Sequence, residues 1–170
     1  MTVEDDLMDM LGAWPGKPLQ SVGRAGLIWF QLGALHEQHD QRGRTRLLGE
    51  FALHIQCPWR IRVDGRLLVG HQDFSVIGVR DDKGFYQPQP GLSWGDQVLE
   101  NISSALLLGP LTVTAVVLKQ QGDLRINLDQ GHTLEVFNTS STDEEVWRVI
   151  KSGRGQKKSR HIVRTGLGYE

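Results

Sequence analysis

Side chains that can do chemistry gather in one short part of this sequence, between residues 51 and 73. Residues 51–63 read FALHIQCPWRIRV, in which apolar and polar residues alternate as they do in a half-buried β-strand. Asp64-Gly65 follows and predicts a two-residue type I′ turn into a second strand at residues 66–70. We expect the polar face of this hairpin, or its end, to carry five functional side chains, namely His54, Gln56, Arg60, His71 and Asp73.

Three of these residues are candidate metal ligands. With Asp64 and Gly65 as the loop, Trp59 lies opposite Gly70, and His54 lies diagonal to Asp73, within reach of a cross-strand neighbour. His54, His71 and Asp73 could then hold Zn²⁺ or a similar ion with a position open for water, as in a metal-dependent hydrolase. No HExxH or CxxC spacing supports this arrangement, so we favour a hydrogen-bonded network that binds no metal.

Other nucleophiles and aromatic residues are more typical of a core. Cys57, the single cysteine, belongs to the apolar row of the strand and is expected to be buried rather than catalytic. No GxSxG, Walker or dinucleotide-binding motif occurs. Among the five tryptophans, Trp94 lies in the segment Asp81 to Gly95, which is rich in proline and glycine, and we expect it to be the most exposed. Gln56, Arg60 and Trp94 are therefore the predicted partner-binding residues.

A basic segment lies near the end of the sequence. No acidic residue occurs from Val146 to Tyr169, where the basic residues are Arg148, Lys151, Arg154, Lys157, Lys158, Arg160 and Arg164. Such a stretch could neutralise phosphate groups of RNA or DNA. It lacks interleaved aromatic residues, and the acidic N-terminal helix offers an internal partner, so we expect a flexible basic turn at residues 151–160 rather than a nucleic-acid site.

Two helices are predicted from capping signals. Thr2 can cap a short helix whose apolar face includes Val3, Leu7 and Leu11, and Trp14-Pro15-Gly16 ends it. A longer helix at Asp96 to Leu108 has cap candidates in Ser93 and Asp96, an apolar stripe, and a stop at Gly109-Pro110.

Strands account for most of the remaining chain. The run from Ala25 to Ala34 predicts a strand, and residues 36–44 an exposed loop. A period of two predicts an antiparallel meander over residues 111–117, 124–128 and 134–136. Residues 146–150 fit a strand better than a helix, and residues 161–164 predict a last short strand. The predicted fold class is α+β, mainly antiparallel sheet.

Length and composition limit the function classes. A chain of 170 residues fits one domain, 1–170, with a formal net charge of −1 that favours neither nucleic acid nor an anionic membrane. No apolar run approaches the ~20 residues that cross a bilayer. The first residues lack a basic leader followed by an apolar core, so we expect a cytoplasmic location.

The hairpin also carries a resemblance. The residues LHIQCPWR at 53–60, followed by VGHQDF at 69–74, resemble a pattern found in small uncharacterised bacterial proteins. GDLRINLDQGHTLEVF at 122–137 and EEVWRV at 144–149 are similar to the C-terminal half of the same group. The resemblance spans about residues 47–149 and implies a self-contained bacterial domain with no known activity.

The sequence thus predicts a non-enzymatic, cytosolic protein-binding domain of the accessory or toxin-immunity sort. Its surface would combine the polar hairpin face with the segment Asp81 to Gly95. No cofactor is expected, except Zn²⁺ or a related ion in the alternative of a metal-dependent hydrolase. The second alternative is nucleic-acid binding through the basic C-terminal segment.

Overall fold

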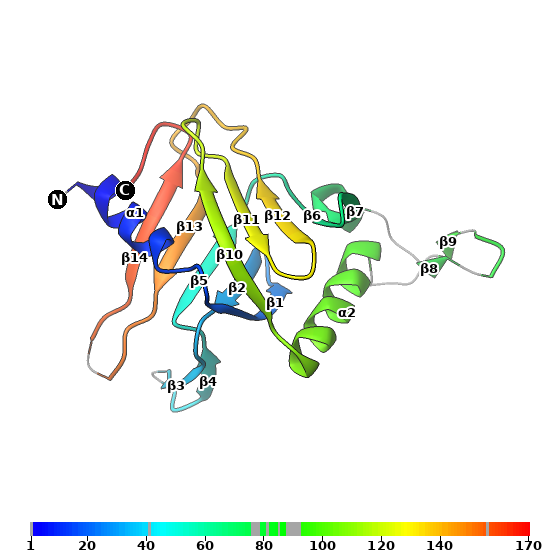
Figure 1. Ribbon diagram of the computed structural model, residues 1–170, viewed down its shortest axis with the longest axis horizontal. Coiled ribbons are helices and arrows are strands. Elements are labelled where there is room, and N and C mark those ends of the chain that lie inside the picture. Colours follow the sequence, from blue (N-terminus) through cyan, green and yellow to red (C-terminus); the bar gives the residue numbers. More distant parts are fainter. Residues whose placement is uncertain are drawn as a thin grey trace.

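Ten strands form one large antiparallel sheet that divides into two halves. The computed structural model describes residues 2–40, 42–75, 79–80, 82–84, 86–87, 93–155 and 157–170. In spatial order, the first half-sheet contains β14 (Arg160–Thr165), β13 (Glu145–Lys151), β5 (Phe51–Ile55), β2 (Ile28–Leu32) and β1 (Pro18–Arg24). The second half-sheet continues with β10 (Leu111–Leu118), β11 (Leu124–Leu128), β12 (His132–Val136), β6 (Trp59–Val63) and β7 (Arg66–Gly70). The predicted α+β fold class is confirmed (Figure 1).

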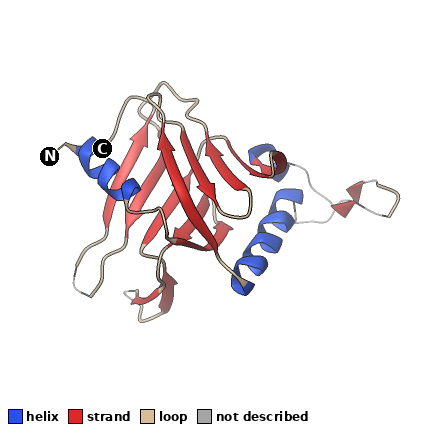
Figure 2. Cartoon of the chain, viewed as in Figure 1, coloured by secondary structure: helices blue, strands red, loops and turns tan. Residues whose placement is uncertain are grey.

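Both predicted helices are present, and both begin with a capping box. In α1 (Val3–Gly12) the Thr2 side chain accepts the Asp5 N–H, and the Asp5 carboxylate accepts the Thr2 N–H in return. In α2 (Trp94–Leu108) Ser93 and Asp96 form the same reciprocal pair, so this helix begins two residues before the predicted start. The two helices lie on opposite sides of the strands in Figure 2.

The long strand predicted for residues 51–63 is wrong, because it is divided between the two half-sheets. β5 pairs with β2 and β13, whereas β6 pairs with β12 and β7. Gln56, Cys57 and Pro58 connect them: Gln56 donates its N–H to Val146 O, and Pro58 has no N–H to give to a ladder. The alternation continues through the link because Cys57 also points into the core, where it is 5% exposed.

The β6–β7 hairpin has the predicted turn but a different register. Asp64 and Gly65 both have positive φ, 49° and 77°, as a type I′ turn requires. A bulge between Ile61 and Arg62 shifts the pairing beyond the turn, so Arg60 rather than Trp59 lies opposite Gly70. The sequence pattern alone does not reveal this bulge.

The segment predicted as an exposed loop at residues 36–44 is partly a hairpin. β3 (His36–His39) and β4 (Thr45–Leu48) pair outside the large sheet, and most of their side chains are exposed as expected. The predicted loop at 81–95 lies partly outside the described residues, and its last two residues belong to α2. Its described part includes β9 (Tyr86–Gln87), which pairs with β8 (Val79–Arg80). A 3₁₀ helix, η1 (His71–Ser75), precedes this region.

The remaining predictions of secondary structure are confirmed. The strand expected between Ala25 and Ala34 is β2, and the meander is β10, β11 and β12. Residues 146–150 belong to β13, which settles the choice between strand and helix, and residues 161–164 belong to β14. Residues 146–150 form a strand rather than a helix because β13 pairs with β5 on one side and with β14 on the other.

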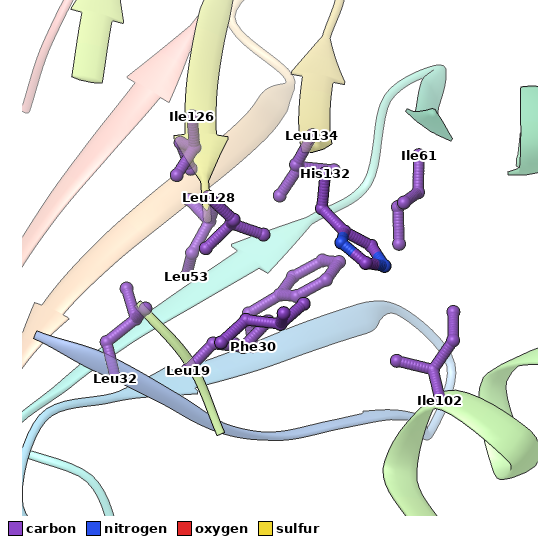
Figure 3. A pocket seen from close by; sticks show the side chains of 11 residues that line it. Leu19, Phe30, Leu32, Leu53, Ile61, Ile102, Ile126, Leu128, His132 and Leu134 are labelled. Carbon is purple, nitrogen blue, oxygen red and sulfur yellow. The ribbon is translucent and has the colours of Figure 1, made fainter. Parts of the chain in front are cut away.

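The two half-sheets close over one apolar core. Figure 3 shows side chains of both halves around a small cavity of about 20 Å³, with Phe30 and Leu53 from the first half and Ile126 and Leu134 from the second. α2 contacts β1 and β7 and thereby bridges the halves, and its Ile102 also lines the cavity. A space of this size accommodates about one water-sized molecule, so the interior is a packed core.

Candidate functional site

The structure separates the three predicted metal ligands. His54 lies on β5, opposite Trp29 and Arg148, whereas His71 and Asp73 lie in η1. The predicted position of His54 diagonal to Asp73 is therefore wrong, because β5 and β7 belong to different half-sheets. Asp73 instead accepts the Gly70 N–H at 2.8 Å. Within the described part of the chain, no three His, Cys, Asp or Glu side chains are grouped to hold a metal ion.

Cys57 is placed as its sequence context predicts. Burial raises the pKa of its thiol to about 12, so the thiolate that a nucleophile needs is scarce at neutral pH. The side chain fills core space between the half-sheets. Both its burial and its raised pKa agree with the core position that the sequence predicts, although Cys57 also lines a hollow described below.

Several of the predicted polar residues do converge, around η1. One hollow of about 200 Å³ lies between the β1–β2 turn, the β5–β6 link and η1, where Gln56 and His71 line it. A second, of about 390 Å³, has lining residues from β6, β7 and η1, among them Arg60 and Asp73. The two hollows share Trp59 and His71. We call them together the η1 cleft, whose lining also includes Arg24, Leu67, Phe74 and Phe137.

An aromatic series supports this cleft from beneath. Trp59 is 3% exposed and packs against Phe74, with ring centroids 5.8 Å apart, and against Phe30, at 6.3 Å. Gly95 allows Phe74 to approach α2, because a Cβ there would lie 2.8 Å from the ring. The cleft is therefore built on packed side chains of β2, β6, η1 and α2.

Ion pairing fixes one wall of the cleft. The Arg24 guanidinium lies over the Phe74 ring, 4.8 Å from its centroid, and donates to both carboxylate oxygens of Asp96 at 2.9 Å. The hydrogen bonds from Arg24 lower the pKa of Asp96, despite a smaller opposing effect of burial. The same carboxylate caps α2, so η1, β1 and the helix N-terminus are tied together.

Arg60 belongs to a cluster that the sequence analysis missed. Glu135 on β12 is 5% exposed, and three arginines surround it: Arg60 Nε lies 2.6 Å from Oε2, Arg62 Nε 3.2 Å from the same oxygen, and Arg125 Nη2 3.2 Å from Oε1. We call these four residues the Glu135 cluster. Burial raises the pKa of Glu135. The hydrogen bond and charge of Arg60, with the charges of Arg62 and Arg125, together outweigh this effect, so the pKa lies below its ordinary value.

The prediction that Trp94 is exposed is wrong. It is half-buried at the start of α2 and packs against the hydrophobic core. Gln56 and Arg60, in contrast, are exposed as predicted. Of the predicted partner-binding residues, Gln56 and Arg60 thus line the η1 cleft, whereas Trp94 packs against the core.

His54 lies in a separate group on the outer face of the first half-sheet. Arg148 lies beside it on β13 and forms an ion pair with Glu145, and His161 on β14 lies near the same arginine. Partial burial, followed by the charge of Arg148, lowers the pKa of both histidines, and Glu145 opposes this effect. The outer face therefore favours neutral imidazoles.

We expect His54 and His161 to make the protein less stable in mild acid. Because their pKa values are lowered from 6.5 in the folded protein, the unfolded chain takes up protons first as the pH falls below 6.5. Urea unfolding at pH 7.5 and 5.5 should show a loss of stability that is smaller in the double variant His54→Gln/His161→Gln. An equal loss in both proteins would contradict this assignment.

The basic residues near the end of the chain are spread over different contacts. Arg160 forms an ion pair with Asp6 of α1, as the acidic character of that helix suggested. Lys151 lies over the Phe51 ring at 5.8 Å, and Arg164 is buried over Tyr169 at 4.7 Å. Arg154, Lys157 and Lys158 are exposed. Two of these basic residues, Arg160 and Arg164, are thus engaged within the protein, since Arg160 pairs with Asp6 and Arg164 is buried. Nucleic-acid binding by this segment stays a prediction.

Comparisons with known proteins add no assignment. No family model, curated protein or solved structure matches this chain. The resemblance to small bacterial proteins therefore stays a prediction. Within the described residues, no helix is long and apolar enough to span a membrane.

Proposed function

We propose that this chain is a non-enzymatic protein-binding domain, of the accessory or immunity sort, whose binding surface is the η1 cleft together with β7. The observation that carries this proposal is the convergence of Gln56, Arg60 and His71 over an aromatic base, beside the last strand of the sheet. Recognition surfaces combine such features, with buried aromatic anchors surrounded by polar groups.

β7 adds apolar contact area to this surface. Leu67 is 64% exposed and Leu68 is 37% exposed, although both occupy a strand. β7 pairs with β6 on one side and is the terminal strand of the sheet order on the other. Among the described residues no further strand pairs with β7, and a terminal strand can accept an extended segment of another protein through backbone hydrogen bonds.

Site-specific photo-crosslinking tests the proposal. A photoreactive amino acid at Leu67 should give a discrete cross-linked partner in cells of the source organism. The control position is Met8, which is 53% exposed and belongs to α1. This helix and β7 lie on opposite sides of the molecule in Figure 1.

Substitution of the cleft provides the second control. The double variant Arg60→Ala/His71→Ala should weaken the product from Leu67 by about tenfold, because it removes two polar groups beside the aromatic base. The proposal is wrong if Leu67 gives no product, if Met8 gives the same product, or if the double variant leaves the product unchanged.

A further inference from the structure

The outer face of the second half-sheet carries concentrated positive charge beside the η1 cleft. We infer that this face, centred on Arg60, Arg62 and Arg125, binds carboxylate side chains of an acidic protein segment. The inference rests on the proposed function and names the chemistry of the partner. Nothing in the sequence analysis pointed to Arg62 or Arg125.

Charge is the first observation. The Glu135 cluster holds three guanidinium groups and one carboxylate, a net charge of +2, in a chain whose formal net charge is −1. The rest of the molecule is thus acidic on balance. An acidic partner would be attracted to this face, against the average charge of the rest of the molecule.

Burial is the second observation. The Glu135 side chain is only 6% exposed, whereas those of Arg60, Arg62 and Arg125 are 45%, 32% and 43% exposed. The carboxylate is therefore covered, and the surface that meets solvent presents N–H donors. Each guanidinium has five N–H donors, and Glu135 accepts one from each. The Nε atoms of Arg62 and Arg125 are buried, so the donors that these two residues can offer a partner are on their terminal nitrogens.

Glu135 also holds the three guanidinium groups in place. Arg60 is fixed further because its guanidinium lies over the Phe137 ring, 5.1 Å from the centroid. A guanidinium group whose position is fixed before binding suits a carboxylate, since two parallel N–H···O bonds can form with little loss of side-chain freedom. Glu135 thus holds the three guanidinium groups in positions from which they can bind a carboxylate of a partner.

Strand register places apolar side chains at both ends of the cluster. Val117 on β10 lies opposite Arg125 and is 46% exposed, and Leu67 on β7 lies opposite Arg62. Single-stranded nucleic acid is held by bases that stack on aromatic rings beside cationic side chains, and neither of these aliphatic side chains offers a ring. A protein segment that mixes acidic and apolar residues can cover them, so we favour an acidic protein segment over a nucleic acid.

Fluorescence anisotropy with defined probes tests the inference. The main probe is a labelled peptide of about eight alternating glutamate and valine residues. The comparison probes are the same peptide with glutamine in place of glutamate, and an oligothymidylate of about eight nucleotides. The glutamate peptide should bind best, and more weakly at about 150 mM than at about 20 mM salt.

Charge variants identify the surface that binds. Arg62→Gln/Arg125→Gln keeps the shorter Arg60–Glu135 pair and should weaken binding of the glutamate peptide by about tenfold. Arg62→Lys/Arg125→Lys keeps both positive charges but removes the planar guanidinium groups that donate two parallel hydrogen bonds, so it should give an intermediate affinity. Arg46→Gln, the same change on the exposed hairpin strand β4, should alter affinity by less than about twofold.

Several outcomes would overturn the inference. They are no binding of the glutamate peptide, equal binding of the glutamine peptide, preference for the oligothymidylate, or an equal loss of affinity with Arg46→Gln. If the photoreactive residue at Leu67 still captures its partner in the Arg62→Gln/Arg125→Gln variant, only the inference that the partner is acidic is wrong. If the glutamate peptide binds as expected but Leu67 captures nothing, only the proposed η1 surface is wrong.

Discussion

Glu135→Gln should lower the free energy of unfolding by about 2–4 kcal/mol at pH 7, as measured by urea denaturation. Removing one member of a buried ion pair typically costs about 3–5 kcal/mol, and partial solvation of the three arginines reduces this figure. The substitution leaves three neighbouring guanidinium groups without a carboxylate, so their mutual repulsion adds to the loss.

Two controls make this prediction specific to the Glu135 cluster. Glu37→Gln makes the same change at an exposed position of β3 and should alter stability by less than about 0.5 kcal/mol. Arg62→Gln added to Glu135→Gln should restore part of the lost stability, because it removes one of the uncompensated charges. Equal effects of Glu135→Gln and Glu37→Gln would contradict the prediction.

The pH dependence of the same variant follows from the lowered pKa. Because Glu135 has a folded pKa below its ordinary value of 4.5, its contribution is fully present above that value. The contribution is lost as the pH falls through the folded pKa, where wild-type Glu135 also becomes protonated. The stability difference between the wild type and Glu135→Gln should therefore narrow in acid.

Trp59→Ala should lower the free energy of unfolding by about 3–5 kcal/mol, the typical cost of removing a buried aromatic ring. Trp59 is 3% exposed and connects β6 with Phe30 of the first half-sheet and Phe74 of η1. Its loss leaves a cavity beneath the η1 cleft and removes the main support of Phe74. Calorimetry or urea denaturation measures the effect.

Trp29→Ala is the matched control for this substitution. Trp29 is half-buried on the outer face of β2, where its ring lies over Gly23 and part of it already contacts solvent. The same deletion there should cost clearly less, since less apolar surface leaves a packed environment. A larger loss for Trp29→Ala than for Trp59→Ala would contradict the assignment of Trp59 as the link between the half-sheets.

The helices and the local turns were predictable from the sequence. Capping boxes use residues three apart, so Thr2 with Asp5 and Ser93 with Asp96 are recognisable without tertiary structure. Asp64-Gly65 predicts its turn for the same reason, since positive φ at both positions is a local preference. Alternation likewise assigned Cys57 and Trp59 to the core.

The candidate site was predictable only in part. Gln56, Arg60, His71 and Asp73 come together around η1 because they are close in sequence on β6, β7 and the adjoining turns. His54 does not join them, because an unbroken alternation of apolar and polar residues does not require an unbroken strand. The alternation gives no sign that the chain passes from one half-sheet to the other at Gln56 to Pro58.

The sequence by itself determined the α+β class, the two helices, the hairpin turn and the inward side of most strands, because capping, turn chemistry and alternation act over a few residues. Only the tertiary structure decided which strands far apart in the chain are neighbours. The pairing of β12 with β6 joins Glu135 to Arg60 across 75 positions of the chain, whereas Arg125 comes from the local β11–β12 hairpin. Long-range pairing depends on how the whole core closes, so the sequence alone does not bring Arg60 and Arg62 to Glu135.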